Sequence, residues 1–350
     1  MSRVTAISGL GGKAPACFLV ETHGARFLLD LGEGPGPGQF PDLSEVGPVD
    51  AILISHGHAD HIGGLHLASE VGNPPVFATA MTRAFAGHSA LARAFDLPPT
   101  GEIEICGVPV QTGRAGHAAG GLWMRIGGEE GVLYTGDICR ESLLYPLDTP
   151  SRAHTLIVDA SYGQYDEDIG SAIGSLVEEA KIGPLLLPLP PTGRGVEIAV
   201  LLNEAGLPVS ICAQHRRAAS LMMDAAEGTL VAGGRERLGA MLTAAATVTE
   251  DVTPNGAMIA ANGGATGGVA RSLLARFVIW PGVGIVMTGH VEAGTEAAVA
   301  LAGGRARFIR WNVHPRHRDL KWLHQVVRPQ STLYAFCDES VAQGLGKSVG

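Results

Sequence analysis

The densest group of chemically able side chains lies in residues 56–61, where His56, His58, Asp60 and His61 alternate with two small residues. This segment follows an apolar run and contains a glycine, so it reads as a buried strand that enters a tight turn. Burying three imidazoles and a carboxylate together is costly unless they are paired or bind a cation. We therefore predict that these four side chains are metal ligands.

Two more candidate ligands follow glycines further along the chain. His117 comes after Gly116, and Asp137 comes after Gly136 at the end of an apolar run. Either residue alone would be an equally good turn residue, but the nearby cluster favours ligation. Imidazole and carboxylate ligands together suit zinc, with manganese or iron as alternatives, and they disfavour an oxygen-rich magnesium or calcium site. The expected cofactor is one or two zinc ions.

The elements that must position these residues differ between the two parts of the chain. Up to about residue 159, short β-branched and aliphatic runs bounded by Gly, Asp or Pro predict strands. Apolar residues three and four apart predict helices over residues 61–70 and 82–94. The predicted strands are 16–20, 26–31, 51–55, 76–79, 108–112, 121–126, 131–135 and 155–158.

From about residue 168 the pattern changes to alternating helices and buried strands, which is typical of a parallel sheet. After residue 305, a strand, a helix over 318–326 and a last strand over 332–336 follow. The predicted elements between these points are helices 169–180 and 195–205 and strands 184–189, 208–212, 257–261 and 284–288.

Composition limits the classes of function. The formal net charge of the 350 residues is -9, so a general nucleic-acid binder is not expected and any polyanion must meet a local basic patch. No membrane helix and no signal peptide are predicted. The five cysteines form no Cys-x-x-Cys pair, which favours a reducing cytoplasm over a disulfide framework or a thiolate zinc site.

Residues 55–64, Ser-His-Gly-His-Ala-Asp-His-Ile-Gly-Gly, resemble the His-x-His-x-Asp-His signature of the metallo-β-lactamase superfamily. Asp30, His117 and Asp137 match the other motifs of that superfamily in order and context. The resemblance implies an αββα sandwich, with His56, His58 and His117 on one metal and Asp60 and His61 on the other. Asp137 would bridge the metals, and Asp30 would support the ligands from behind.

Four later segments, taken in order, resemble the β-CASP branch of that superfamily, whose members process nucleic acids. They are residues 158–163, 188–197, 260–268 and 289–295. The resemblance implies an α/β fold in which residues 1–172 and 306–350 form the sandwich. Residues 173–305 would form an inserted α/β β-CASP-like domain.

His314 best matches the later catalytic histidine of the branch, which pairs with an acidic residue, here Asp159. His317 is the rival candidate, and a histidine on a surface loop is the alternative. A carboxylate behind an imidazole fixes its tautomer and raises its basicity, so His314 could protonate a leaving alkoxide.

The chain departs from the branch after its final strand, where no histidine is available as the last metal ligand. Cys337 or Asp338 could chemically replace it, since thiolates and carboxylates both bind zinc, but an ordinary buried thiol is the favoured interpretation of Cys337.

The predicted function is metal-dependent hydrolysis of RNA or single-stranded nucleic acid by a metal-bound hydroxide, with Asp60, Asp159 and His314 as catalytic residues. Alternatives are a hydrolase of lactones, thioesters or cyclic phosphodiesters, and a catalytically reduced subunit that binds RNA or protein. A homodimer is compatible with each. Arg194, Arg310 and Arg316 are predicted to bind phosphates. The last two belong to a basic run that would otherwise be a solvated face: Arg305, Arg307, Arg310, Arg316 and Arg318.

Overall fold

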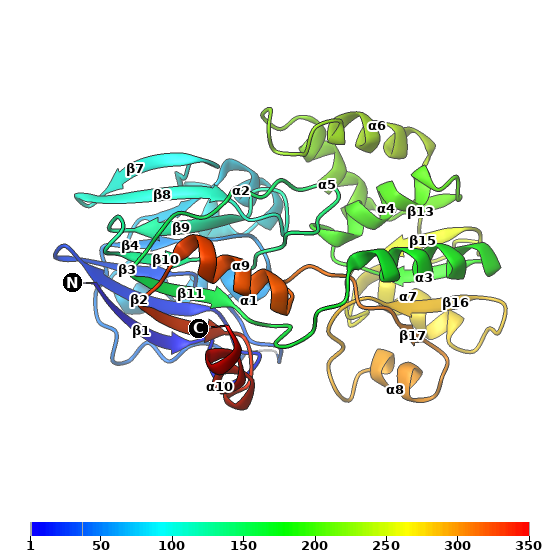
Figure 1. Cartoon of the computed structure of the whole chain (residues 1–350). Helices are drawn as coiled ribbons and strands as arrows, with labels where there is room; N and C mark the ends of the chain where they lie inside the picture. Colours follow the sequence, from blue (N-terminus) through cyan, green and yellow to red (C-terminus); the bar gives the residue numbers. More distant parts are fainter. Residues whose placement is uncertain (1, 37, 350) are drawn as a thin grey trace. The chain divides into compact units, whose positions relative to one another are not determined.

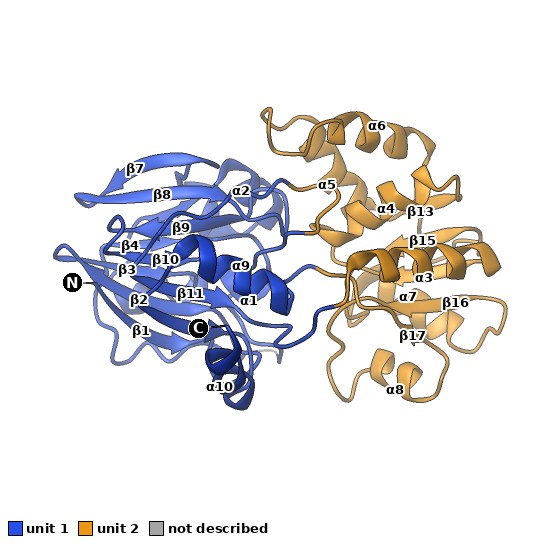
Figure 2. Ribbon diagram, viewed as in Figure 1, with its two compact units in different colours: residues 1–140, 146–166, 313–350 blue, residues 141–145, 167–312 orange. Residues whose placement is uncertain are grey.

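The computed structural model describes residues 2–36 and 38–349. The chain divides into two compact units, coloured separately in Figure 2. Unit 1 comprises Met1–Arg140, Pro146–Asp166 and Val313–Gly350, and unit 2 comprises Glu141–Tyr145 and Glu167–Asn312. The sequence predicts two domains that divide at residues 172/173 and 305/306. Their correspondence to these two units stays a prediction.

The first sheet of unit 1 has the strand order β1-β2-β3-β4-β5-β6. Figure 1 labels β1 to β4 of this sheet. The pairs β1–β2 and β2–β3 are antiparallel, and the pairs from β3 to β6 are parallel. The strands are Arg3–Ser8, Cys17–Thr22, Ala25–Leu29, Ala51–Leu53, Val76–Ala78 and Phe95–Asp96.

The second sheet of unit 1 has the order β18-β11-β10-β9-β8-β7, so the last strand of the chain joins it at an edge. Strands β7 to β10 form antiparallel neighbours, and β10, β11 and β18 run parallel. Their bounds, from β7 to β11 and then β18, are Gly101–Ile105, Val108–Arg114, Leu122–Ile126, Val132–Tyr134, Thr155–Asp159 and Ser331–Ala335.

The two sheets pack face to face around one apolar cluster that includes Phe18 and Phe27 from the first sheet and Met124 and Ile157 from the second. The outer face of each sheet has its own cluster, in which helices supply the covering side chains. Alternating residues of a strand face opposite sides of its sheet. Because most strand residues here are apolar, both faces of each sheet are apolar. The predicted αββα sandwich is therefore confirmed. Its helices are α1 Ala59–Ile62, η1 Leu65–Val71, α2 Ala80–Ala86, η2 Ser89–Arg93, α9 His317–Val327 and α10 Glu339–Ser348.

Two helices predicted as continuous are each broken in two. The first, over 61–70, becomes α1 and the 3-10 helix η1, separated by Gly63 and Gly64. A Cβ at Gly64 would lie 2.7 Å from the Gly32 carbonyl oxygen, so the chain approaches too closely there for another residue. The second, over 82–94, becomes α2 and the 3-10 helix η2 because Gly87 adopts a left-handed conformation with φ of 58°.

Unit 2 contains a six-stranded sheet in the order β14-β13-β15-β12-β16-β17, and every strand pair in it is parallel. The predicted parallel sheet is thus confirmed. Its strands, from β12 to β17, are Leu185–Pro188, Val209–Ile211, Ala246–Thr247, Ala257–Ala260, Gly284–Met287 and Arg307–Phe308. Its helices, α3 to α8, are Ile169–Ile182, Arg194–Glu204, Ala213–Met223, Gly234–Ala244, Gly268–Phe277 and Glu296–Ala302.

Within the two ranges that the structure describes, 2–36 and 38–349, no helix combines the length and the apolar character that crossing a membrane requires.

Candidate metal centre

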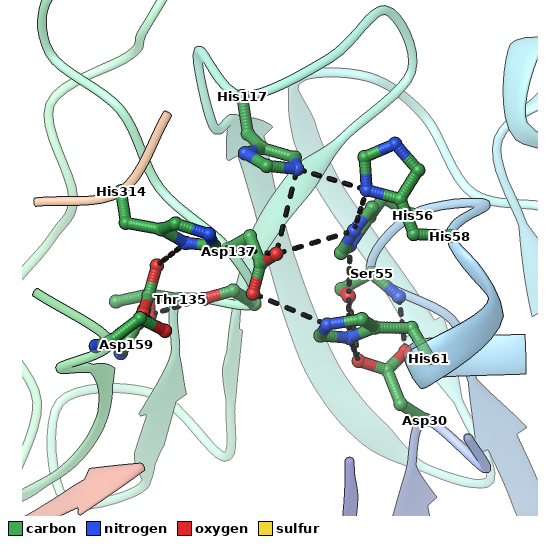
Figure 3. Close-up of polar contacts among 12 residues, drawn as sticks. Asp30, Ser55, His56, His58, His61, His117, Thr135, Asp137, Asp159 and His314 are labelled. Carbon is green, nitrogen blue, oxygen red and sulfur yellow. Dashed lines mark hydrogen bonds and ion pairs between the residues drawn. The ribbon is translucent and has the colours of Figure 1, made fainter. Parts of the chain in front are cut away.

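The polar side chains of unit 1 that could do chemistry gather where strands end. His56 and His58 lie in the turn between β4 and α1, His117 follows β8, and Asp137 follows β10 (Figure 3). Loops at the ends of strands present side chains from a rigid framework, so residues far apart in sequence can meet with fixed geometry. The close-up in Figure 3 shows these four side chains directed toward one another.

The four residues form a compact set of donors. His58 Nδ1 lies 3.1 Å from both His56 Nε2 and His117 Nε2. The Oδ2 atom of Asp137 lies 3.6 Å from His56 Nε2 and 3.5 Å from His117 Nε2. One ligand atom from each residue falls within 4.8 Å of all the others. The spacing is that of groups able to share one ion.

The electrostatics of the three imidazoles suit a metal. Burial lowers the pKa of His56 well below its usual value, and the neighbouring histidines lower it further. Burial and the charge of His117 lower the pKa of His58 to about 3, and burial also lowers that of His117. All three rings are therefore neutral at pH 7 and can offer lone pairs, as zinc, manganese and iron require. The donor set fits the predicted metal.

His117 is held by a contact on its far side. Its Nδ1 lies 2.7 Å from the backbone carbonyl oxygen of Val313, to which a protonated Nδ1 donates. This hydrogen bond fixes the tautomer that leaves Nε2 free to bind a metal, as in many protein metal sites. Val313 belongs to the last segment of unit 1, so the centre is assembled from both ends of the chain.

Asp30 contacts the turn that carries the candidate ligands, and its role in supporting them stays a prediction. Its side chain is fully buried and its backbone is left-handed, with φ of 56°. The carboxylate accepts hydrogen bonds from the Ser55 amide at 2.7 Å, the Ser55 hydroxyl at 2.6 Å, the Tyr134 hydroxyl at 2.6 Å and His61 Nδ1 at 2.7 Å. Burial raises the pKa of Tyr134 well above its usual value, so this phenol remains a donor.

His61 and Asp60 stand apart from the four-residue set. His61 Nε2 lies 3.2 Å from Asp137 Oδ1, whereas the Nε2 atoms of His56 and His117 lie 3.6 and 3.5 Å from Oδ2. Burial lowers the pKa of His61, but Asp137 and Asp30 outweigh that effect and raise it well above its usual value. Among the described residues, no group of three or more closely spaced metal-binding side chains includes Asp60 or His61.

His314 meets Asp159 as the sequence predicts. Its Nδ1 lies 2.7 Å from Asp159 Oδ2, and its ring packs 5.4 Å from the ring of His117, between centroids. Burial lowers the pKa of His314, but Asp159 and Asp137 together raise it above its usual value. His314 thus combines a raised pKa with a place beside the donor set, and both favour a proton donor.

Asp159 is itself fixed by its neighbours. Its Oδ1 accepts hydrogen bonds from the amide of Ser161 at 3.0 Å and from the hydroxyl of Ser161 at 2.6 Å, and its backbone amide donates to the Thr135 hydroxyl at 3.0 Å. The rival candidate, His317, begins α9, and its backbone amide donates to the Tyr165 carbonyl. His314, not His317, faces Asp159.

The predicted phosphate-binding arginines have different surroundings. Arg316 requires a correction: its side chain is buried, and its Nε donates to Asp319 Oδ2 at 2.9 Å, so it stabilises the first turn of α9 instead of facing a ligand. In unit 2, Arg194 Nε donates to the Thr288 hydroxyl at 3.0 Å, and Arg310 lies over the ring of Phe308.

The rest of the basic run is also paired in part. Arg318 Nε donates to Asp166 Oδ1 at 3.0 Å, and Arg307 forms an ion pair with Glu179. Arg305 donates to three backbone carbonyls, those of Phe277, Val278 and Trp280. The run is therefore not a uniform basic face.

Cys337 lies away from the ligands. Its Sγ contacts the Tyr334 carbonyl oxygen at 3.7 Å, and it packs with Ala160 and Leu345 on the outer face of the second sheet. Burial and the charge of Asp159 raise its pKa to about 11, so it remains a thiol. The thiol therefore lies on the face of the second sheet opposite the candidate ligands, where it cannot replace the missing histidine. Its neighbour Phe336 faces the other side, because consecutive residues alternate between the two faces.

Three supporting residues were not predicted: Ser55, Tyr134 and Thr135. Each contacts a carboxylate residue far away in sequence. Their only sequence signal is their position, because Ser55 directly precedes His56 and the other two lie just before Asp137.

Comparisons with known proteins agree with this geometry. Residues 10–179 match the family model of the metallo-beta-lactamase superfamily. A transcription termination factor FttA from Cenarchaeum symbiosum is 25% identical over 248 residues, which cover 57% of this chain and 38% of that protein.

Two further relatives are similar to a comparable extent. Cleavage and polyadenylation specificity factor subunit 2 from Oryza sativa is 27% identical over 58% of this chain and 33% of its own length. An RNase J-like protein from Methanocaldococcus jannaschii is 26% identical over 54% of this chain and 51% of its own length. The matches thus span about a third to a half of the curated relatives, and all three relatives are of the β-CASP type.

Proposed function

We propose that this chain, a metallo-β-lactamase-fold protein similar to the β-CASP branch, is a metal-dependent hydrolase that cleaves phosphodiester bonds in RNA or single-stranded nucleic acid. The observation that carries the proposal is the His314–Asp159 pair beside the four-donor set. A buried metal site alone would fit many hydrolases, whereas an imidazole paired with a carboxylate beside that site suits a leaving oxygen that must gain a proton.

His56, His58, His117 and Asp137 would hold the metal, with zinc preferred and manganese or iron as alternatives. A bound ion supplies Lewis acidity, which acidifies water and stabilises negative charge on a phosphoryl group. Asp159 would accept the Nδ1 proton of His314 in a hydrogen bond and so hold the ring in place. Nε2 would then be the nitrogen that gives its proton to the leaving oxygen. Tyr162, whose ring lies 5.1 Å from that of His314 between centroids, would limit its rotation.

The substrate class rests on the relatives and on the arginines of unit 2. Two of the three relatives carry names that refer to RNA processing, the polyadenylation factor and the RNase J-like protein. We propose Arg194 and Arg310 as contacts to substrate phosphates and no longer include Arg316. A cytoplasmic location and a homodimeric state remain predictions from the sequence.

The test is a cleavage assay on single-stranded RNA of defined length, run with zinc or manganese and with a chelator. We expect shorter RNA products that the chelator abolishes and that the variants His58→Ala and His314→Ala strongly reduce. A parallel panel of lactone, thioester and cyclic phosphodiester substrates covers the small-molecule hydrolases. RNA left intact under every metal condition would contradict the proposal, and turnover confined to the small substrates would replace it.

A further inference from the structure

The two oxygens of Asp137 face different surroundings. Oδ2 lies 3.6 and 3.5 Å from the Nε2 atoms of His56 and His117, and 3.8 Å from His314 Nδ1. Oδ1 lies 3.2 Å from His61 Nε2. In residues 2–36 and 38–349, two closely spaced donor groups include Asp137, and neither includes His61. One has four members, with His56, His58 and His117. The other has three, with Asp159 and His314, but there His314 Nδ1 already lies at hydrogen-bond distance, 2.7 Å, from Asp159 Oδ2. One side of Asp137 is therefore complete for a metal ion, and the other is not.

The space beside His61 is filled by an aromatic side chain. The ring of Phe336 lies 5.5 Å from the ring of His61 between centroids, at an interplanar angle of 67°, and 6.2 Å from the ring of Phe18. Phe336 directly follows β18, the strand after which the superfamily resemblance places a last metal-binding histidine. A phenyl ring has no lone pair to donate, so this residue cannot complete a second site.

The neighbours of Phe336 do not compensate for it. Cys337 packs on the opposite face of the second sheet, with Ala160 and Leu345. Asp338 is exposed and precedes the first turn of α10. Neither belongs to a closely spaced group of donors within the described residues.

His61 has a structural task that does not require a second ion. Its Nδ1 lies 2.7 Å from Asp30 Oδ2 and its Nε2 lies 3.2 Å from Asp137 Oδ1, so both ring nitrogens face carboxylates. These contacts link the Asp30 network to Asp137 and turn Oδ2 of Asp137 toward the histidine set. His61 can thereby orient a ligand of the first ion without binding an ion itself.

We infer that each chain holds a single metal ion, bound by His56, His58, His117 and Asp137, and that His61 is a positioning residue. The inference rests on the metal centre of the proposed function but not on RNA as the substrate. It assigns to Phe336 the role of closing the space that a second ion would need.

The first experiment measures metal content, by mass spectrometry, of full-length protein loaded with excess zinc and then desalted. We expect one zinc ion per chain for the unmodified protein, none for His117→Ala, and one, held more weakly, for His61→Ala. Two ions in the unmodified protein and one in His61→Ala would overturn the inference, because His61 would then be a ligand.

The second experiment measures whether a histidine at position 336 lets the chain bind a second zinc ion. Phe336 has a left-handed backbone with φ of 62°, a conformation that both His and Asn adopt more readily than most residues. Phe336→His supplies the missing donor, and Phe336→Asn is the matched control that relieves the same apolar contact without supplying an imidazole. We expect two zinc ions in Phe336→His and one in Phe336→Asn.

Circular dichroism checks that both variants fold. One ion in a folded Phe336→His would contradict the assignment of Phe336, and if that variant fails to fold, the His61→Ala measurement decides alone. A chain with one ion that leaves RNA intact would sink the proposed substrate and keep this inference. A chain that binds two ions and cleaves RNA would support the proposed substrate and overturn the inference of a single ion.

Discussion

At the scale of single residues, Asp159 determines what His314 can do. Replacing Asp159 with Asn keeps the size and a hydrogen-bond acceptor but removes the negative charge that raises the pKa of His314. We expect Asp159→Asn and His314→Ala each to lower kcat for RNA by about 10²- to 10⁴-fold, the usual contribution of a positioned acid. Metal content should stay at the unmodified level in both.

The control for this prediction is His324→Ala. His324 stacks on Tyr334 in the same unit but belongs to none of the donor groups described above. Steady-state kinetics should give an unchanged kcat for it. A loss of kcat in His324→Ala as large as in His314→Ala would mean that the assay reports general destabilisation.

A second histidine makes unit 2 sensitive to acid. His215 is fully buried, its Nε2 lies 3.1 Å from the Pro190 carbonyl oxygen, and its Nδ1 lies 3.1 Å from Cys212 Sγ. Burial lowers its pKa to about 4 from an unfolded value of 6.5. Between these two values the unfolded chain binds a proton that the folded chain does not, so stability falls as the pH drops from 6.5 to 4.

The expected loss over that window is roughly 3 kcal/mol, since each pKa unit corresponds to about 1.4 kcal/mol. His215→Gln, whose amide can still donate to Pro190, should flatten this dependence, and His154→Gln, a change at a half-exposed histidine of unit 1, should not. Hydrogen exchange of amides in β12 and β15 at several pH values measures the effect on unit 2 alone. Equal pH slopes in all three proteins would show that His215 is not the responsible group.

The sequence singled out candidate ligands where they are dense and local. His56 and His58 stand within one turn beside His61, and burying such a group has few explanations other than a metal. The sequence could not separate His61, which lies outside the four-donor set, from its two neighbours. Ser55 and Tyr134 could not be found in this way, since their roles depend on contacts with Asp30 that only the fold creates. Their polar side chains carry no local pattern that separates them from ordinary strand residues.

The replacement of the last histidine needed the structure for a related reason. Consecutive residues near a strand face opposite sides of the sheet. A register shift of one residue would therefore decide whether Cys337, which could bind a metal, or Phe336, which could not, faces His61. Ligand chemistry alone offered Cys337 and Asp338 as substitutes, but Phe336 is the side chain that meets His61.

At the scale of elements, Gly32 controls how closely the segment after β3 approaches α1. A Cβ at Gly32 would lie 1.8 Å from the Asp60 carbonyl oxygen and 3.0 Å from the Ala16 amide nitrogen, and both of these are backbone atoms that cannot rotate away. We expect Gly32→Ala to destabilise unit 1 by about 3 kcal/mol or more through overpacking, and to lower its affinity for zinc.

Gly346→Ala is the matched control. Gly346 lies in α10, also in unit 1, and a Cβ there would meet no atom within 4 Å. Alanine favours helices over glycine by up to about 1 kcal/mol, so this variant should be neutral or slightly more stable. Urea unfolding of unit 1 compares the two, and equal effects would mean that the contact with Asp60 is not the cause.

The strands were predicted better than the helices. Short β-branched runs between Gly and Pro located most strands because their boundaries are set by local turn residues. The helices α5, α6, α7, α8 and α10 were not predicted. In α6, for example, only Gly234, Leu238 and Met241 are buried, so its apolar stripe is too thin to stand out in sequence.

At the scale of the whole molecule, the net charge of -9 opposes the approach of RNA. Binding of the proposed RNA substrate would therefore depend on a few local cations, and several arginines of the basic run are already paired with Asp166, Asp319 or Glu179. This pairing reduces the number of phosphates that the run can neutralise. RNA affinity should accordingly depend only modestly on salt concentration. Each arginine that contacts a phosphate should add its own increment to the slope of log K against log salt.

The last prediction separates a local contact from the overall field. Arg310→Ala and Lys181→Ala each remove one positive charge from unit 2, so both change the net charge equally. If Arg310 contacts a phosphate, its loss should reduce the slope of log K against log salt by about 0.7, the value for single strands. Lys181, which is paired with Glu178 on α3, should leave the slope unchanged. Fluorescence anisotropy of labelled RNA across a salt series measures both, and equal slopes in the two variants would assign Arg310 to the solvated face instead.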